Sequence, residues 1–404
     1  MRTPRSLVLL GWFIATAIFA GCAGSTAPSA PSQSSDANRI ALLRAPMSPA
    51  RLLQLQASGQ LQGPVPQARL HERLNRIAQP RPTFGHRAAG TVGLWATDTD
   101  FNYLVGQTAN GRNTVVAVDL SKNNCLSPVG VRVDASQNEW VACELTSPSS
   151  TNGALQQYSA TGKYEKQYLF GCPSSVKGCS TFSGYGWDSG IDSKGNVFAA
   201  LNIYSIEVCT SSCVSNLGAG FEWWSQGKTS ATPHLIGLGD SCSPICGVGF
   251  MDFDASDNIW FTFVGYNGTT YGPGLGEITN PAKNPTLTIV EPAGTYGFFG
   301  GVNVTNGGSI LNVVDQQSRT ISQYHLPLAP GGTPFNTLGP TPLNAFGVGD
   351  PVSGGLNKDE SKFALADSVG WIDIGRYAAN KWTSVGSPNF ISGLEGAAYT
   401  PSDK

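Results

Sequence analysis

The chain has 404 residues, of which 13% are charged and 49 are glycine, and its formal net charge is −2. Ordinary globular proteins contain about 25% charged residues, so this composition favours a turn-rich β fold with extensive buried surface. It excludes the strongly basic class of nucleic-acid-binding proteins. Length alone would suggest two or three domains, but internal repeats indicate a single repeat domain after an N-terminal extension.

Residues 1–21 have the features of an export signal. Arg2 and Arg5 precede an apolar run over 7–20 that is too short to cross a membrane comfortably. The run ends in Phe-Ala-Gly-Cys, which resembles a bacterial lipobox. This resemblance implies that Cys22 is lipidated and anchors the protein in the cell envelope. Because Ala23 is not an acidic retention signal, the outer membrane is favoured over the inner one. Ordinary secretion after cleavage nearby is the alternative.

Two further segments separate the signal from the repeats. Residues 22–38 are rich in Ser, Ala and Pro and are expected to form a flexible tether. Residues 39–89 form a basic arm, which contains eight Arg and one acidic residue, Glu72. From residue 88 onward there are 15 basic and 25 acidic residues, so the arm could fold against the acidic repeats or contact anionic lipid headgroups. A partly ordered spacer is the alternative.

The segment 90–404 contains a recurring phrase, Asp-x-x-x-Asn-x-aromatic, flanked by short runs of β-branched and aromatic residues. This pattern is typical of a hairpin whose turn uses Asp and Asn to cap backbone groups. The first residues of successive copies are 43 to 62 positions apart, which indicates stacked units of about four strands, as in a β-propeller. The complete copies start at Asp134, Asp192 and Asp254, weaker ones start at Thr305 and Asn357, and a truncated one starts at Thr400.

Six copies predict six inner strands and therefore a six-bladed propeller of the all-β class. The last copy ends after one strand, at 396–399, and strand-like segments at 94–97, 103–106 and 114–118 supply the missing part. One blade built from both ends of the repeat domain would close the ring and remove an exposed sheet edge.

The phrases resemble NHL-type propeller repeats. The segment 251–262, followed by Gly-Glu-Ile-Thr at 276–279, is also similar to the repeat of streptogramin-lyase-like propellers. The resemblance covers about residues 90–404 and implies the propeller fold. It does not imply an activity, because such scaffolds carry unrelated functions.

Eight cysteines remain after Cys22, and an even number in an exported chain predicts disulfides. If each inner strand runs away from one face of the ring, all eight cysteines fall on that face, which we call the top face. Chain topology then predicts the pairs Cys125–Cys143, Cys172–Cys179, Cys209–Cys213 and Cys242–Cys246. Metal-bound thiolates are the alternative.

Residues just ahead of or inside the inner strands should lie near the mouth of the central channel. Carboxylates and an Asn amide there are suitable ligands for Ca²⁺ or Mg²⁺, and Arg132 lies among them with the opposite charge. The gluconolactonase-like (SMP-30) six-bladed propellers are similar in holding a divalent ion this way. Scattered acids without a shared ligand are the alternative. The candidate ligands are Asp188, Asp252, Asn303 and Asp350.

Aromatic residues near the top connections form a second set of candidates, because aromatic platforms bind sugars, peptides and protein hot spots. Packing between blades is the alternative for all of them. The binding candidates are Trp187, Trp223, Trp224, Tyr266 and Phe299, together with the acidic Glu395.

The sequence argues against several kinds of catalysis. It has four His, no His-x-Glu and no paired His, so the metal-bound acid/base of streptogramin-type lyases is missing. It also lacks a Gly-x-Ser-x-Gly elbow, a phosphate loop and a dinucleotide fingerprint. We therefore expect a monomeric, lipid-anchored binding module that recognises an envelope or extracellular protein or a carbohydrate. A lactonase-type, divalent-metal-dependent hydrolase is the competing prediction, and a purely structural envelope protein is a third.

Overall fold

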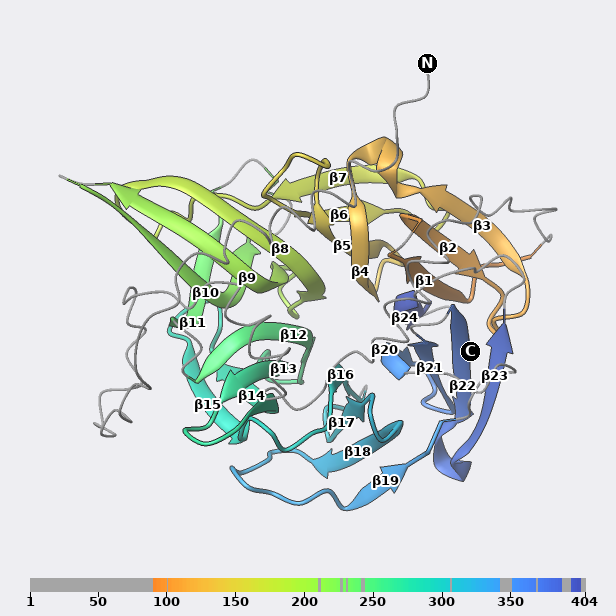
Figure 1. Cartoon of the computed structure of the whole chain (residues 1–404). Coiled ribbons are helices and arrows are strands. Elements are labelled where there is room, and N and C mark those ends of the chain that lie inside the picture. The colour runs from red at the N-terminus through yellow and green to blue at the C-terminus, as the bar shows by residue number, and fades with distance from the viewer. Residues whose placement is uncertain are drawn as a thin grey trace, which may run out of the picture.

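In the computed structural model, the chain forms a ring of six four-stranded antiparallel sheets (Figure 1). The structure describes residues 90–400 except 100, 210–211, 226–227, 230–231, 241–243, 306, 342–350, 368–369 and 387–393. The predicted signal, Cys22, the tether, the basic arm and Asp350 lie outside the described residues. The prediction of a six-bladed, all-β propeller is confirmed. None of the helices in the described segments has the length and apolarity needed to cross a membrane.

The blades follow one another around the ring, and each is numbered here from the one that holds both ends of the described chain. From inner to outer strand, blade 1 consists of β24 (Leu394–Tyr399), β1 (Leu94–Asp98), β2 (Tyr103–Gln107) and β3 (Thr114–Asp119), and blade 2 of β4 (Leu126–Val133), β5 (Glu139–Leu145), β6 (Ala154–Tyr158) and β7 (Tyr164–Leu169). Blade 3 consists of β8 (Cys179–Ile191), β9 (Val197–Cys209), β10 (Cys213–Trp224) and β11 (His234–Asp240), and blade 4 of β12 (Ile245–Phe253), β13 (Ile259–Tyr266), β14 (Tyr271–Thr279) and β15 (Thr286–Glu291). Blade 5 consists of β16 (Phe299–Val304), β17 (Ile310–Asp315), β18 (Thr320–His325) and β19 (Asn336–Leu338), and blade 6 of β20 (Pro351–Leu356), β21 (Lys362–Asp367), β22 (Trp371–Arg376) and β23 (Lys381–Gly386).

Two short 3₁₀ helices, η1 (Leu120–Asn123) and η2 (Tyr377–Ala379), accompany these strands. The recurring phrase forms the turn between the first two strands of a blade, as predicted. Asp134 Oδ1 accepts hydrogen bonds from the backbone N–H groups of Ser136 and Asn138, both at 2.9 Å, and Asp134 Oδ2 accepts one from the Trp140 indole at 2.9 Å. The repeated Asp is therefore a turn former, and Asp134 and Asp254 also orient the Trp six positions later.

The ring closes in blade 1, where strands from opposite ends of the described chain pair. β24 lies antiparallel to β1, with Leu94 opposite Tyr399 and Trp95 opposite Ala398. The Thr400 N–H donates to the Gly93 carbonyl at 3.1 Å. This confirms the predicted closure, and β1 is paired on both sides, with β24 and with β2.

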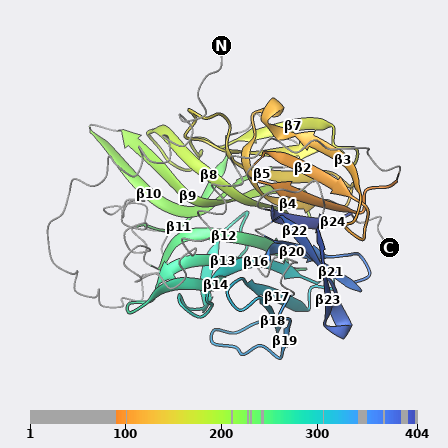
Figure 2. The ribbon, with the colours of Figure 1, turned by 45° about the vertical axis from the view of Figure 1, so that its right-hand side comes forward.

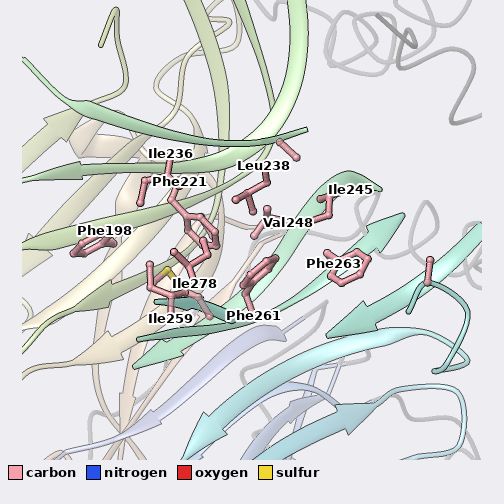
Figure 3. Close-up of a cluster of buried hydrophobic side chains, with 14 residues drawn as sticks. Phe198, Phe221, Ile236, Leu238, Ile245, Val248, Ile259, Phe261, Phe263 and Ile278 are labelled. Carbon is pink, nitrogen blue, oxygen red and sulfur yellow. The ribbon is translucent and has the colours of Figure 1, made fainter. Parts of the chain in front are cut away.

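The core consists of apolar layers between neighbouring blades. The layer between blades 3 and 4 is the one drawn in Figure 3, where Phe198 and Phe221 of blade 3 and Phe261 and Phe263 of blade 4 contribute side chains. Phe221 and Phe261 meet edge to face, with ring centroids 5.3 Å apart. Each large apolar side chain buried in this way contributes roughly 1.5–3 kcal/mol, and blade faces are stable only against their neighbours.

Blade 3 differs from the others in length. Its strands β8, β9 and β10 have 13, 13 and 12 residues and project past the neighbouring blades in both views (Figures 1 and 2). β9 and β10 remain paired out to Cys209 and Cys213 at the tip. We call the projecting part of these three strands the arm of blade 3.

Three disulfides join the pairs expected from topology: Cys125–Cys143, Cys172–Cys179 and Cys209–Cys213. Cys246 is also disulfide-bonded, whereas its expected partner, Cys242, lies outside the described residues. The described cysteines lie at the starts of inner strands, at the ends of returning strands or in connections between blades, which places them on the top face.

Candidate functional site

Four inner strands bring a polar cluster together at the centre of the ring. Arg132 of β4 donates from Nη2 to Asp188 Oδ2 of β8 at 2.9 Å. The same nitrogen donates to the carbonyl of Met251 in β12 and, at 3.3 Å, to that of Val302 in β16. One guanidinium group thus connects blades 2, 3, 4 and 5. We call Arg132, Asp188, Asp252 and Asn303 the channel cluster.

The two carboxylates of the channel cluster also accept backbone hydrogen bonds. Asp188 Oδ2 accepts from the Met251 N–H at 3.0 Å. Asp252 Oδ2 accepts from the Val304 N–H at 2.8 Å and from Asn303 Nδ2 at 3.2 Å. The structure therefore brings together three of the four predicted metal ligands, but with protein donors already bound to both carboxylates.

Burial decides the electrostatics of the cluster. The side chains of Arg132 and Asp188 are 14% and 1% exposed. Burial raises the pKa of Asp188 and that of Asp252, and the positive charge of Arg132 opposes both shifts. Burial works against the charge of Arg132 as well, but the carboxylates of Asp188 and Asp252 raise its pKa. The arginine is accordingly the cation that these two acids share.

A metal ion at this cluster would need oxygen atoms that no protein donor already occupies. Asp188 Oδ1 and Asn303 Oδ1 are buried and have no hydrogen-bond partner among the described residues. Asp188 Oδ1 lies against the backbone of Gly130, where a Cβ would collide with it, so no ion fits on that side. Asn303 Oδ1 together with Asp252 is the remaining donor set, and it lies beside a guanidinium that repels cations.

A small apolar cluster joins three of the inner strands. Val129, Phe250 and Val352, from three different inner strands, form a buried cluster against which Trp187 packs. The Trp187 and Phe250 rings meet edge to face with centroids 6.3 Å apart. Trp187, predicted as a binding residue, therefore packs against this apolar cluster.

Tyr185, two positions before Trp187 on β8, is an exposed residue that was not predicted from the sequence. The register of β8 and β9 shifts between Gly184 and Gly186 and again between Gly186 and Asp188, so β8 bulges at Tyr185 and at Trp187. Such bulges re-aim side chains, and Tyr185 is 40% exposed. Burial of part of the ring, together with the negative charge of Glu144, raises the pKa of Tyr185.

A signal for this bulge exists in the sequence, because Tyr185 lies between two glycines. Glycine inside a strand often marks a bulge or a close backbone approach. Gly186 is a position of close backbone approach, because a Cβ there would lie 2.9 Å from the Cys143 carbonyl oxygen and from the Phe170 ring.

The other aromatic candidates are spread over the molecule. Trp224 is 1% exposed and packs with Tyr168, so it is a core residue. Trp223 stacks on His234, with ring centroids 4.1 Å apart, near the end of blade 3 opposite the top face. Tyr266 stacks on Tyr271 at the β13–β14 hairpin, with centroids 4.4 Å apart.

Two candidates remain on inner strands. Phe299 begins β16, and its side chain is outside what the structure describes. Glu395 belongs to β24 and is partly buried. Of the predicted binding residues, Trp187 lies two positions from Tyr185 on the same strand.

Within the described segments, one group of at least three His, Cys, Asp or Glu side chains has metal-ligand spacing: Glu207, Cys209 and Cys213 at the tip of the arm. Cys209 and Cys213 are joined in a disulfide, so these sulfurs are not thiolate ligands in this form of the protein.

Comparison with solved structures finds structural neighbours of low sequence identity. No family model and no curated protein matches the sequence. A chain of a nidogen/laminin complex is 11% identical, with a TM-score of 0.48 over 78% of this chain and 100% of that one. The Dos1 propeller is 11% identical, with a TM-score of 0.43 over 77% and 71%. Regucalcin, a calcium-binding protein from Agrobacterium tumefaciens, is 12% identical, with a TM-score of 0.43 over 68% and 79%.

Proposed function

We propose that this protein is a binding module of the cell envelope, held there by a lipid on Cys22, with the outer membrane favoured, and that it recognises its ligand through the top face of blades 2–4. The observation that carries the proposal is the double bulge of β8 at Tyr185 and Trp187, where Tyr185 is 40% exposed. An exposed aromatic ring with a polar end is suited to stacking on a sugar ring or to anchoring a protein partner.

The disulfides support the same location. The Cys143 carbonyl of β5 lies close to Gly186, and the bond of Cys143 to Cys125 ties β5 to the residue just before β4. The Cys172–Cys179 bond restrains the connection that leads into β8. A surface restrained in advance loses less conformational entropy when a ligand binds, and loops on a rigid scaffold are the usual place for binding.

The test compares Tyr185→Ala with Tyr185→Phe and with Phe335→Ala, a control at another exposed aromatic residue, which is 47% exposed. Each variant is titrated against immobilised envelope proteins and a panel of cell-surface oligosaccharides. We expect Tyr185→Ala to weaken binding of the ligand by about tenfold or more, and the other two to bind as the unchanged protein does. Equal binding by Tyr185→Ala would refute this location.

A divalent-metal-dependent hydrolase remains a second candidate because Asp252 and Asn303 do converge at the channel, as that activity requires. Their hydrogen bonds to each other and to the Val304 N–H, and the neighbouring Arg132, favour the binding module. Thermal melting in the presence of divalent ions separates the two candidates, because only the hydrolase requires a bound metal ion.

A further inference from the structure

The arm of blade 3 carries a strand edge that the rest of its own sheet leaves open. β11 pairs with β10 only over Gly218–Trp223. In the part of the chain that the structure describes, no strand pairs with the outer side of residues 213–217 of β10. Val214, in the middle of this stretch, is 52% exposed. We call residues 213–217 the open edge.

The direction of the backbone groups on the open edge follows from the disulfide at its end. Cys209 and Cys213 are directly opposite each other with Cα atoms 4.1 Å apart, the close spacing of a pair that does not exchange backbone hydrogen bonds. The Cys209 N–H indeed donates to the Gly178 carbonyl, on the other side of β9. Because the pattern alternates, the N–H and C=O groups of Cys213, Ser215 and Leu217 point outward.

The open edge also lacks the features that usually prevent a strand edge from pairing with another chain. Edges in soluble proteins are usually protected by charged side chains, especially Lys, or by Pro. The outer strand of blade 2 has Glu165 and Lys166 in this role, whereas residues 213–217 read Cys-Val-Ser-Asn-Leu, with neither charge nor proline. The Cys209–Cys213 bond holds this strand in its extended form before any partner arrives.

We propose that the open edge pairs with the open edge of a second copy of this chain, which makes the protein a twofold-symmetric dimer through the arm of blade 3. Antiparallel pairing centred on Ser215 places Cys213 opposite Leu217 of the other copy, so all three outward residues of each edge exchange hydrogen bonds. A twofold-symmetric contact requires a surface that is complementary to itself. Because the open edge carries no charge, pairing two copies of it brings no like charges together. The dimer replaces the monomer expected from the sequence and does not depend on the proposed ligand site.

The first experiment measures the mass of the full chain by sedimentation over a range of concentrations with disulfides intact. Ser215→Pro removes an outward N–H without touching the β9–β10 ladder, and Ser215→Ala keeps it. We expect a concentration-dependent dimer that Ser215→Pro weakens by about tenfold or more and Ser215→Ala leaves unchanged. Circular dichroism checks that both variants are folded. A monomer at every concentration, or a dimer that Ser215→Pro does not affect, overturns the proposal.

A second experiment reads the register directly. In the proposed pairing the two Ser215 Cα atoms are about 5.5 Å apart, which is within disulfide range. Ser215→Cys should therefore form an interchain disulfide, seen as a reducible dimer on a gel. Thr286→Cys, at an exposed position on the outer strand of blade 4, is the matched control. Equal cross-linking of the two variants contradicts the proposed pairing.

Discussion

At the scale of single residues, the centre of the ring depends on Arg132, whose guanidinium contacts three inner strands besides its own. Removing one partner of a buried ion pair leaves the other charge uncompensated and costs about 3–5 kcal/mol. We therefore expect Arg132→Met to lower the free energy of unfolding by about that amount in urea titrations. Arg112→Met, at an exposed position, should change it by less than about 0.5 kcal/mol. Equal unfolding midpoints for the two variants would show that Arg132 does not tie the blades together.

A second residue makes stability depend on pH. Glu139 of β5 is fully buried, and burial raises the pKa of its carboxyl to about 9, with the charge of Asp134 adding to the shift. The folded state therefore keeps a proton that the unfolded state loses above its ordinary pKa of about 4.3. Between those two values the unfolded state binds fewer protons, so stability falls as pH rises.

Glu139→Gln removes this titration. We expect its urea midpoint to decline less steeply than that of the unchanged protein between about pH 5 and 9, with the largest difference at the alkaline end. Glu222, whose pKa burial also raises, should keep part of the slope in the variant. Parallel pH profiles for the variant and the unchanged protein would mean that Glu139 is already ionised in the folded state.

At the scale of elements, the disulfides differ in how much chain they enclose. Cys125 and Cys143 are 18 residues apart and fully buried, whereas Cys209 and Cys213 are 4 residues apart at the tip of the arm. Loop-closure entropy assigns about 3 kcal/mol to the first bond and about 2 kcal/mol to the second. Replacing the first pair by Ala should therefore lower the thermal midpoint more. The reverse order would indicate that the arm contributes to the cooperative core.

The elements also differ in how much of their structure is encoded in local sequence. The strands that flank Asp134, Asp192 and Asp254 were predictable because turn chemistry and β-branched runs are local signals. The bulge at Tyr185 was not, because two register shifts within one strand depend on how β9 and the Phe170 connection pack against it. Its flanking glycines were the available local signal.

The channel cluster shows the corresponding limit for the site. Sequence analysis placed Asp188, Asp252 and Asn303 near one channel, and the structure does bring them together. It could not assign their partner, because the reach of Arg132 across four strands depends on the relative placement of separate blades. A count of acids near a channel predicts a cation, and here that cation is an internal arginine, which is bonded to Asp188 and whose charge acts on Asp252.

At the scale of the whole molecule, the ring is stable because its first and last strands share a blade. Deleting residues 394–404 removes β24 and opens the edge of β1, including the pairing of Trp95 with Ala398. We expect the shortened chain to lose the cooperative unfolding transition and to associate through the open edge. Circular dichroism melts and size-exclusion chromatography would show both. A sharp transition at the original midpoint would mean that five blades suffice.

The channel cluster is an internal ion-pair network. We propose that ligands bind at the top face and that no metal ion binds at the cluster. The most direct test is the melting temperature of the full chain, disulfides intact, in EDTA and in millimolar Ca²⁺, Mg²⁺, Mn²⁺ or Zn²⁺. An ion at about 100 times its dissociation constant would add about 2.7 kcal/mol of stability. We predict no shift with any of the four ions. A rise of several degrees with one ion, lost in Asp252→Ala, would contradict the claim and favour the metal-dependent hydrolase.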